Sequence, residues 1–113
     1  MDNQLAKTEI IIIFITVPDI KTAEEISAVL VKKKLAACVN TIPGLTSVYM
    51  WQDEVCKDDE MLLQVKSVPE KFDLICTEVK SIHPYDLPEI IAIPVILGFQ
   101  PYLDWVKNET NNR

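Results

Sequence analysis

The stretch Glu9-Ile10-Ile11-Ile12-Ile13-Phe14-Ile15-Thr16-Val17 (EIIIIFITV) decides how this chain folds. Nearly every position is apolar and most are β-branched, which favours a strand over a helix. Because polar side chains mark neither face of this strand, we expect both faces to be covered and the strand to lie at the centre of a sheet. The run is far shorter than the roughly 20 apolar residues that a membrane-spanning helix needs.

Helical signals follow this strand and recur twice later in the chain. Asp19 or Thr22 is the expected N-cap of the first helix, and Ser67 with Pro69 has the pattern of a second helix start. His83-Pro84 ends the second helix, because proline disfavours helical geometry in the residue before it. The predicted helices span residues 20–35, about 67–82, and 102–107.

Four more strand signals complete the pattern. Polar residues 52–59 are predicted to form the turn of a long hairpin, and Pro94 restricts the last strand to an edge or a bulge. The resulting β-α-β-β-α-β order with a terminal helix predicts a ferredoxin-like α+β fold. We expect one domain over residues 1–113, with an ordered core at about 9–107. The predicted strands are 36–42, 45–51, 60–66 and 90–97.

The predicted hairpin carries apolar side chains on both faces. Val48 and Met50 point one way, whereas Tyr49 and Trp51 point the other. Two helices cover only one face of such a sheet, so a monomer would leave a large apolar face in water. We therefore expect a homo-oligomer whose sheets pack face to face.

The acidic composition narrows the possible partners. The formal net charge of −6 disfavours binding to nucleic acid or to anionic membranes. Asp2 and Glu9 lie where a signal peptide would be positively charged, so we expect a cytoplasmic protein without membrane insertion. The three cysteines are an odd number without C-x-x-C spacing, which predicts free thiols.

Few side chains in the sequence suit catalysis or metal binding. His83 is the only histidine, and no serine or cysteine lies in a nucleophile-elbow motif, so a hydrolase is the least favoured interpretation. His83 and Cys38 are the candidate soft metal ligands, although both also fit structural roles. Lys66 lies in a largely apolar strand and needs a partner, which Glu60, Glu89 or an anionic ligand could provide.

Several short motifs together closely resemble the CutA divalent-cation tolerance family. The similarity runs from about Glu9 to Val106 in the order of the family. It rests on Ala36-Ala37-Cys38-Val39-Asn40, Pro43-Gly44, Ser47-x-Tyr49-x-Trp51, Lys66, His83-Pro84-Tyr85-x-x-Pro88-Glu89-Ile90 and Tyr102-x-x-Trp105.

The resemblance implies a ferredoxin-like subunit in a tight homotrimer, with a cytoplasmic role in tolerance of copper and other divalent ions and no established enzymatic activity. The trimer of that family looks like the nitrogen-regulatory PII proteins, which bind small effectors between subunits. By position, the recurrent cleft residues of the family are Cys38, Tyr49, Trp51, Glu60, Lys66, His83, Tyr85, Glu89 and Trp105.

This chain departs from the family pattern at three positions. Members proposed to bind copper can carry a thiol where this chain has Ile15 and a second histidine where it has Ile82. Both changes remove a soft ligand. Asp53 replaces the usual hairpin glycine and tolerates left-handed geometry.

Two functional hypotheses follow from the sequence and the resemblance. The first is a non-enzymatic trimer in divalent metal tolerance, with copper or zinc bound at His83 and Cys38. The second is a PII-like module that binds a small anionic effector in an inter-subunit cleft lined by Lys66, Glu89, Tyr49 and Trp51.

Overall fold

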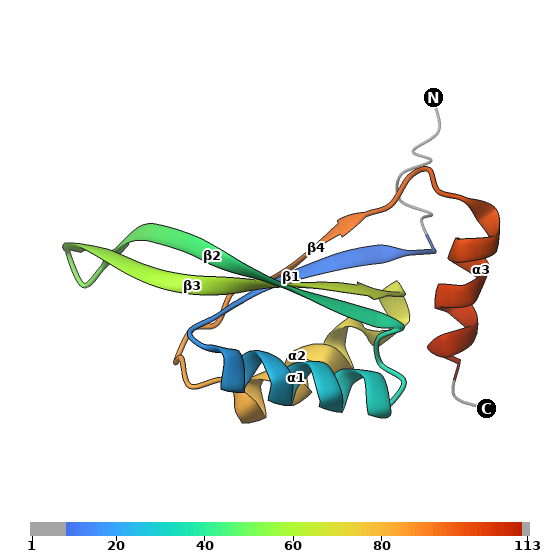
Figure 1. The fold of residues 1–113 in the computed structure, drawn as a ribbon, viewed down its shortest axis with the longest axis horizontal. Helices are drawn as coiled ribbons and strands as arrows, with labels where there is room; N and C mark the ends of the chain where they lie inside the picture. Colours follow the sequence, from blue (N-terminus) through green and yellow to red (C-terminus); the bar gives the residue numbers. More distant parts are fainter. Residues whose placement is uncertain (1–8, 112–113) are drawn as a thin grey trace.

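The computed structural model describes residues 9–111 and confirms the predicted α+β architecture. A four-stranded antiparallel sheet has the order β2-β3-β1-β4, with α1 and α2 side by side on one face and α3 at one end (Figure 1). No helix in residues 9–111 is long and apolar enough to cross a bilayer. The elements are β1 Ile11–Val17, α1 Ile20–Lys32, β2 Cys38–Trp51, β3 Glu54–Ser67, the 3₁₀ helix η2 Pro69–Lys71, α2 Phe72–Ile82, β4 Ile90–Pro94 and α3 Gln100–Glu109.

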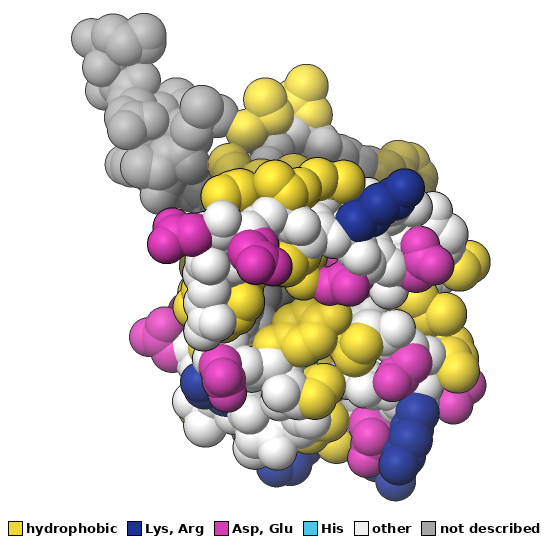
Figure 2. Space-filling view, turned by 90° about the vertical axis from the view of Figure 1, so that its left-hand side faces the viewer, with side chains coloured by type: hydrophobic (Ala, Val, Ile, Leu, Met, Phe, Trp, Pro, Cys, Tyr) yellow, Lys and Arg dark blue, Asp and Glu magenta, His cyan; other side chains and the backbone are white. Residues whose placement is uncertain are grey.

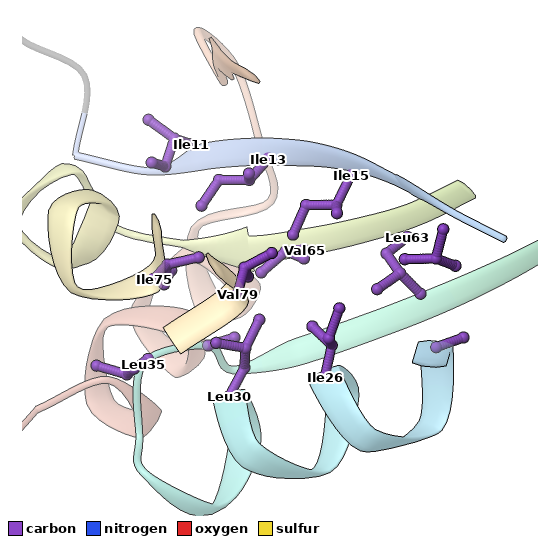
Figure 3. Close-up of a cluster of buried hydrophobic side chains, with 13 residues drawn as sticks. Ile11, Ile13, Ile15, Ile26, Leu30, Leu35, Leu63, Val65, Ile75 and Val79 are labelled. Atoms are coloured by element: carbon purple, nitrogen blue, oxygen red, sulfur yellow. The ribbon is translucent and has the colours of Figure 1, made fainter. Parts of the chain in front are cut away.

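The strand β1 lies at the centre of the sheet, as its uninterrupted apolar sequence predicted. It pairs with β3 on one side and β4 on the other. Alternate side chains of β1 point toward α1 and α2, where they form the main core with residues of β3 and both helices (Figure 3). The labelled core side chains are Ile11, Ile13, Ile15, Ile26, Leu30, Leu35, Leu63, Val65, Ile75 and Val79.

The other face of the sheet, which we call the open face, has no helix over it (Figure 1). Because side chains alternate along a strand, β1 presents Ile12 and Phe14 there, and their cross-strand partners in β4 are Ile93 and Ile91. Ile91 and Ile93 are 53% and 45% exposed. The described part of the chain therefore leaves an apolar sheet surface in contact with solvent.

The hairpin turn is much shorter than the predicted turn at residues 52–59. Only Gln52 and Asp53 form it, with φ of 51° and 68°, and β3 already begins at Glu54. Two consecutive residues with left-handed backbone conformation are typical of a two-residue hairpin turn. Asp53 adopts this conformation, as expected. The prediction was wrong because polar side chains cover both faces of β3 near its tip, so no alternation reveals the strand.

The two strands predicted at 36–42 and 45–51 are one strand, β2. A bulge between Ile42 and Leu45 interrupts the register, and Gly44 has a φ of 83° there. A bulge kinks a strand without ending it, so the Pro43-Gly44 signal marked an irregularity and not an end. The projecting hairpin gives a radius of gyration of 15.1 Å, compared with about 13 Å for a compact domain of this length.

The ends of two helices also differ from the predictions. Asp19 caps α1 by accepting a hydrogen bond from the Thr22 amide, but α1 ends at Lys32 and not at residue 35. Ser67 is not a helix cap: it ends β3, is fully buried, and donates its hydroxyl hydrogen bond to the Leu35 carbonyl at 2.5 Å. A buried hydroxyl needs such a partner, and this tertiary contact takes precedence over local capping.

The C-terminal elements differ by a few residues from their predicted ranges. The strand β4 lies at the sheet edge, as Pro94 indicated, and ends at that residue instead of residue 97. The helix α3 runs from Gln100 to Glu109, longer than the predicted 102–107. Thr110 is buried and its hydroxyl donates to the Val106 carbonyl, so ordered structure continues past residue 107.

Candidate functional site

A groove of about 590 Å³ lies between the β2-β3 hairpin and residues 83–89, which connect α2 to β4. Figure 2 faces the hairpin end of the molecule and shows hydrophobic side chains at the centre of this end with acidic side chains around them. The groove is lined by Thr16, Ser47, Val48, Tyr49, Met50, Trp51, Glu60, Tyr85, Asp86, Leu87 and Glu89. It includes five of the nine predicted site residues.

Strand alternation and a rigid connection place the polar groups of this groove. Tyr49 and Trp51 are two residues apart on β2 and so point to the same face. Pro84 and Pro88 restrict the backbone on either side of Tyr85. The Tyr85 hydroxyl donates a hydrogen bond to Glu60 Oε2 at 2.8 Å, which ties the connection to β3.

Both tyrosines in the groove donate a hydrogen bond to a neighbouring carboxylate. Burial and then the hydrogen bond to Glu60 raise the pKa of Tyr85 above its ordinary value. A hydrogen bond from the Tyr49 hydroxyl to Asp58 is the main cause that raises the pKa of Tyr49 to about 12. At neutral pH both phenols therefore act as hydrogen-bond donors to carboxylates.

His83 is buried behind the groove, with both ring nitrogens hydrogen bonded to the main chain. Nε2 lies 2.7 Å from the Thr16 carbonyl oxygen, and Nδ1 accepts a hydrogen bond from the Tyr85 amide at 3.2 Å. A carbonyl can only accept, so these contacts require the neutral tautomer with its proton on Nε2. This arrangement leaves the imidazole no free lone pair for a metal ion or for a substrate proton.

Replacement of His83 by alanine is expected to lower the free energy of unfolding by about 1–3 kcal/mol, because it removes the buried hydrogen bond from the imidazole to the Thr16 carbonyl. Urea denaturation at one fixed protein concentration measures this change. His83→Gln, which keeps a donor, should recover part of the loss, and Ser81→Ala on the exposed end of α2 should change stability little. An effect of His83→Ala no larger than that of Ser81→Ala would contradict the structural role.

The remaining predicted site residues lie at the other end of the sheet. Cys38 is the cross-strand partner of Lys66, which is six residues from Glu60 along β3 and hence about 20 Å from it. The Lys66 ammonium donates to Asn40, so its suggested pairing with Glu60 or Glu89 does not occur within one chain. Trp105 lies on α3, its ring centroid 5.6 Å from that of Tyr102.

Within one chain, the predicted metal contacts do not converge. His83 contacts the main chain at Thr16, whereas Cys38 lies at the register position of Ile12, about 13 Å away along β1. In residues 9–111, no three His, Cys, Asp or Glu side chains come close enough together to hold a metal ion. Cys38, Cys56 and Cys76 are free thiols, as predicted.

Ile15 and Ile82, which stand where some relatives carry a thiol and a second histidine, pack in the core of this chain. Ile15 is fully buried in the core beneath the helices, on the opposite face of the sheet from Cys38. Ile82 packs against the same core at the end of α2. Both side chains contribute to packing, and neither faces the groove.

The sequence analysis did not identify Asp58 as a residue of this region. Asp58 lies two residues before Glu60 on β3 and so shares its face, but the tip of β3 was taken for a turn. Asp86 follows Tyr85 between the two prolines and also lines the groove.

Residues 11–109 match the family described as CutA1 divalent ion tolerance protein. "Divalent-cation tolerance protein CutA" of Thermus thermophilus is 48% identical over 99 residues, 88% of this chain and 96% of that protein. "Protein CutA, chloroplastic" of Arabidopsis thaliana is 40% identical over 102 residues, 90% of this chain but 56% of the plant protein.

Solved structures also match over nearly the whole chain. The structure described as "stable protein, CutA1, from a psychrotrophic bacterium Shewanella sp. SIB1" has a TM-score of 0.90 and 40% sequence identity. The match covers 94% of this chain and 99% of that structure. At this identity, the agreement supports common ancestry as well as a common fold.

Proposed function

Because this chain belongs to the CutA1 divalent ion tolerance family, we propose that it contributes to tolerance of divalent metal ions, copper or zinc among them, without catalysing a reaction. The observation that carries this proposal is the match to the family over residues 11–109. Both ring nitrogens of His83 are hydrogen bonded to the main chain. This agrees with a non-catalytic role, because a general base needs a free lone pair. We propose the cytoplasm as its location.

Cys38 is the better of the two candidate metal contacts. It is half-buried at the start of β2, and a thiolate is a preferred ligand of zinc and monovalent copper. His83 could bind a metal only after releasing one of its main-chain hydrogen bonds. A complete site needs further ligands, which copies of the chain around a symmetry axis could supply.

A homotrimer is the assembly that we propose. The uncovered apolar face formed by β1 and β4 is the kind of surface that oligomers bury. The projecting hairpin gives each subunit a long arm with exposed Val48, Met50 and Val55 for contacts with a neighbour.

Titration of the purified protein with Zn²⁺ and Cu²⁺ tests the metal contacts. Cys38→Ala is expected to weaken binding by at least about tenfold, since loss of even an outer-shell partner can cost that much. His83→Ala should change affinity by less than about twofold, because both ring nitrogens are already occupied. Isothermal titration calorimetry, with thiols kept reduced, measures both affinities.

Cys56→Ala is the matched control, because it removes a half-buried thiol near the hairpin tip. Unchanged affinity in Cys38→Ala would exclude Cys38 as a metal contact. A tenfold loss in His83→Ala would mean that the imidazole releases its main-chain partners and binds the metal.

The groove supports a second candidate function, the binding of a small effector. Its volume of about 590 Å³ is within the usual range for sites that bind small molecules. The expected anionic effector, however, depended on Lys66, which lies about 20 Å away in the same chain. The residues that line the groove include no Lys or Arg, so an anion there would need a positive charge from elsewhere, such as Lys66 of another subunit.

A further inference from the structure

We propose that the groove binds the alkylammonium group of a small organic amine. This site is independent of Cys38 and does not rest on the proposed role in metal tolerance. The proposal follows from four features of the groove: its aromatic walls, its excess of carboxylates, the position of Glu60 with one oxygen held by Tyr85 and the other open to the groove, and the spacing of the acidic side chains.

Aromatic rings form much of the groove wall. Tyr49, Trp51 and Tyr85 all line it, and Tyr49 and Trp51 are 41% and 42% exposed. The face of an aromatic ring attracts a cation within about 6 Å of its centre, and tryptophan does so most strongly. An alkylammonium group also has apolar carbons that can contact Leu87, which lines the same groove.

The charges along the groove are all negative. Glu60, Asp86 and Glu89 line it, and none of the described lining residues is Lys or Arg. Asp58 lies just behind Tyr49, so its charge adds to the same field. A concave surface with charges of one sign concentrates ligands of the opposite sign.

Glu60 provides a specific anchor for the ammonium group. Glu60 is only 8% exposed, and its Oε2 accepts a hydrogen bond from the Tyr85 hydroxyl at 2.8 Å. Oε1 accepts no hydrogen bond from any residue that the structure describes, although the residue lines the groove. Oε1 is not a buried oxygen without a partner, so it is open to the groove, where an ammonium N–H could donate to it.

The spacing of the acidic side chains favours an organic cation over a metal ion. A divalent cation such as Ca²⁺ needs six or more oxygen ligands within about 2.6 Å. In the described chain no three potential ligand side chains converge closely enough to bind an ion. Carboxylates spread around a groove with aromatic walls suit a larger, more diffuse cation.

Binding of n-butylammonium tests the proposal, with 1-butanol as a neutral molecule of similar shape. The indole N–H resonance of Trp51, assigned by its absence in Trp51→Phe, should shift and saturate at millimolar n-butylammonium. 1-Butanol should cause a much smaller shift at the same concentration. An equal response to both molecules, or none to n-butylammonium, would overturn the proposal.

Charge-removing variants locate the binding group. Glu60→Gln and the exposed Glu89→Gln should each weaken n-butylammonium binding, Glu60→Gln by about tenfold or more. Glu89 is exposed, so its variant tests the charge even if Glu60→Gln folds poorly. Glu70→Gln, an exposed carboxylate on η2, is the matched control and should bind like the wild type.

The same experiment separates two other occupants. If inorganic phosphate shifts the Trp51 resonance and n-butylammonium does not, the groove binds anions and the proposal fails. If n-butylammonium binds only in Lys66→Ala, a lysine from a second copy fills the groove in the native protein, and the proposal fails as well. Neither result depends on the affinity of the protein for Zn²⁺ or on Cys38. The metal proposal is therefore tested separately.

Discussion

Replacement of Leu30 by alanine is expected to lower the free energy of unfolding by about 2–5 kcal/mol, the usual range for a leucine removed from a packed core. Leu30 is fully buried on α1 and points into the cluster between the helices and the sheet (Figure 3). Alanine would leave a cavity in the cluster that also contains Ile13 and Val79. Urea denaturation at one fixed protein concentration measures the change.

Leu74→Ala is the matched control for this prediction. Leu74 lies on α2 but is 51% exposed, so the same chemical change should cost much less. Comparable losses in the two variants would mean that the core does not lie between these helices and the sheet as described.

Replacement of Ile93 by aspartate is expected to convert the proposed trimer into a monomer. Ile93 lies on the edge strand β4, beside Ile12 of β1 on the open face of the sheet. If subunits bury this face, the variant places an unpaired carboxylate in an apolar interface, which costs several kcal/mol per subunit. Analytical ultracentrifugation should give the mass of three 12.8 kDa chains for the wild type and of one chain for the variant.

Thr77→Asp provides the control for added charge. Thr77 is exposed on α2, on the face of the molecule away from the open sheet surface, so this variant should remain a trimer. A wild-type protein that sediments as a single chain at all concentrations would contradict the trimer itself. An Ile93→Asp trimer would mean that the interface lies elsewhere.

The candidate site was only partly predictable from the sequence. Tyr49, Trp51, Glu60, Tyr85 and Glu89, which the family resemblance assigned to a cleft between subunits, line one groove within the chain. The order of motifs along the chain, however, gave no information on how far apart these residues lie in the folded sheet. Cys38 and Lys66 therefore joined the same predicted cleft, although the long β3 separates them from Glu60 by about 20 Å.

The role of His83 illustrates the same limit. As the only histidine of the chain, it was the natural candidate for metal binding. Its availability depends on whether other groups occupy its two nitrogens. Those groups are the carbonyl of Thr16, 67 positions earlier, and the amide of Tyr85.

The sequence by itself determined the order of the elements, the central position of β1 and the α+β fold, because these follow from local periodicity and from apolar segments that must be buried. It did not determine the length of β3, whose polar tip projects from the fold and leaves no periodic signal. Only the tertiary structure decided which polar groups meet: Ser67 with Leu35, His83 with Thr16, and Tyr85 with Glu60. Hydrogen bonds between distant segments depend on how whole strands and helices pack, and no local pattern encodes that arrangement.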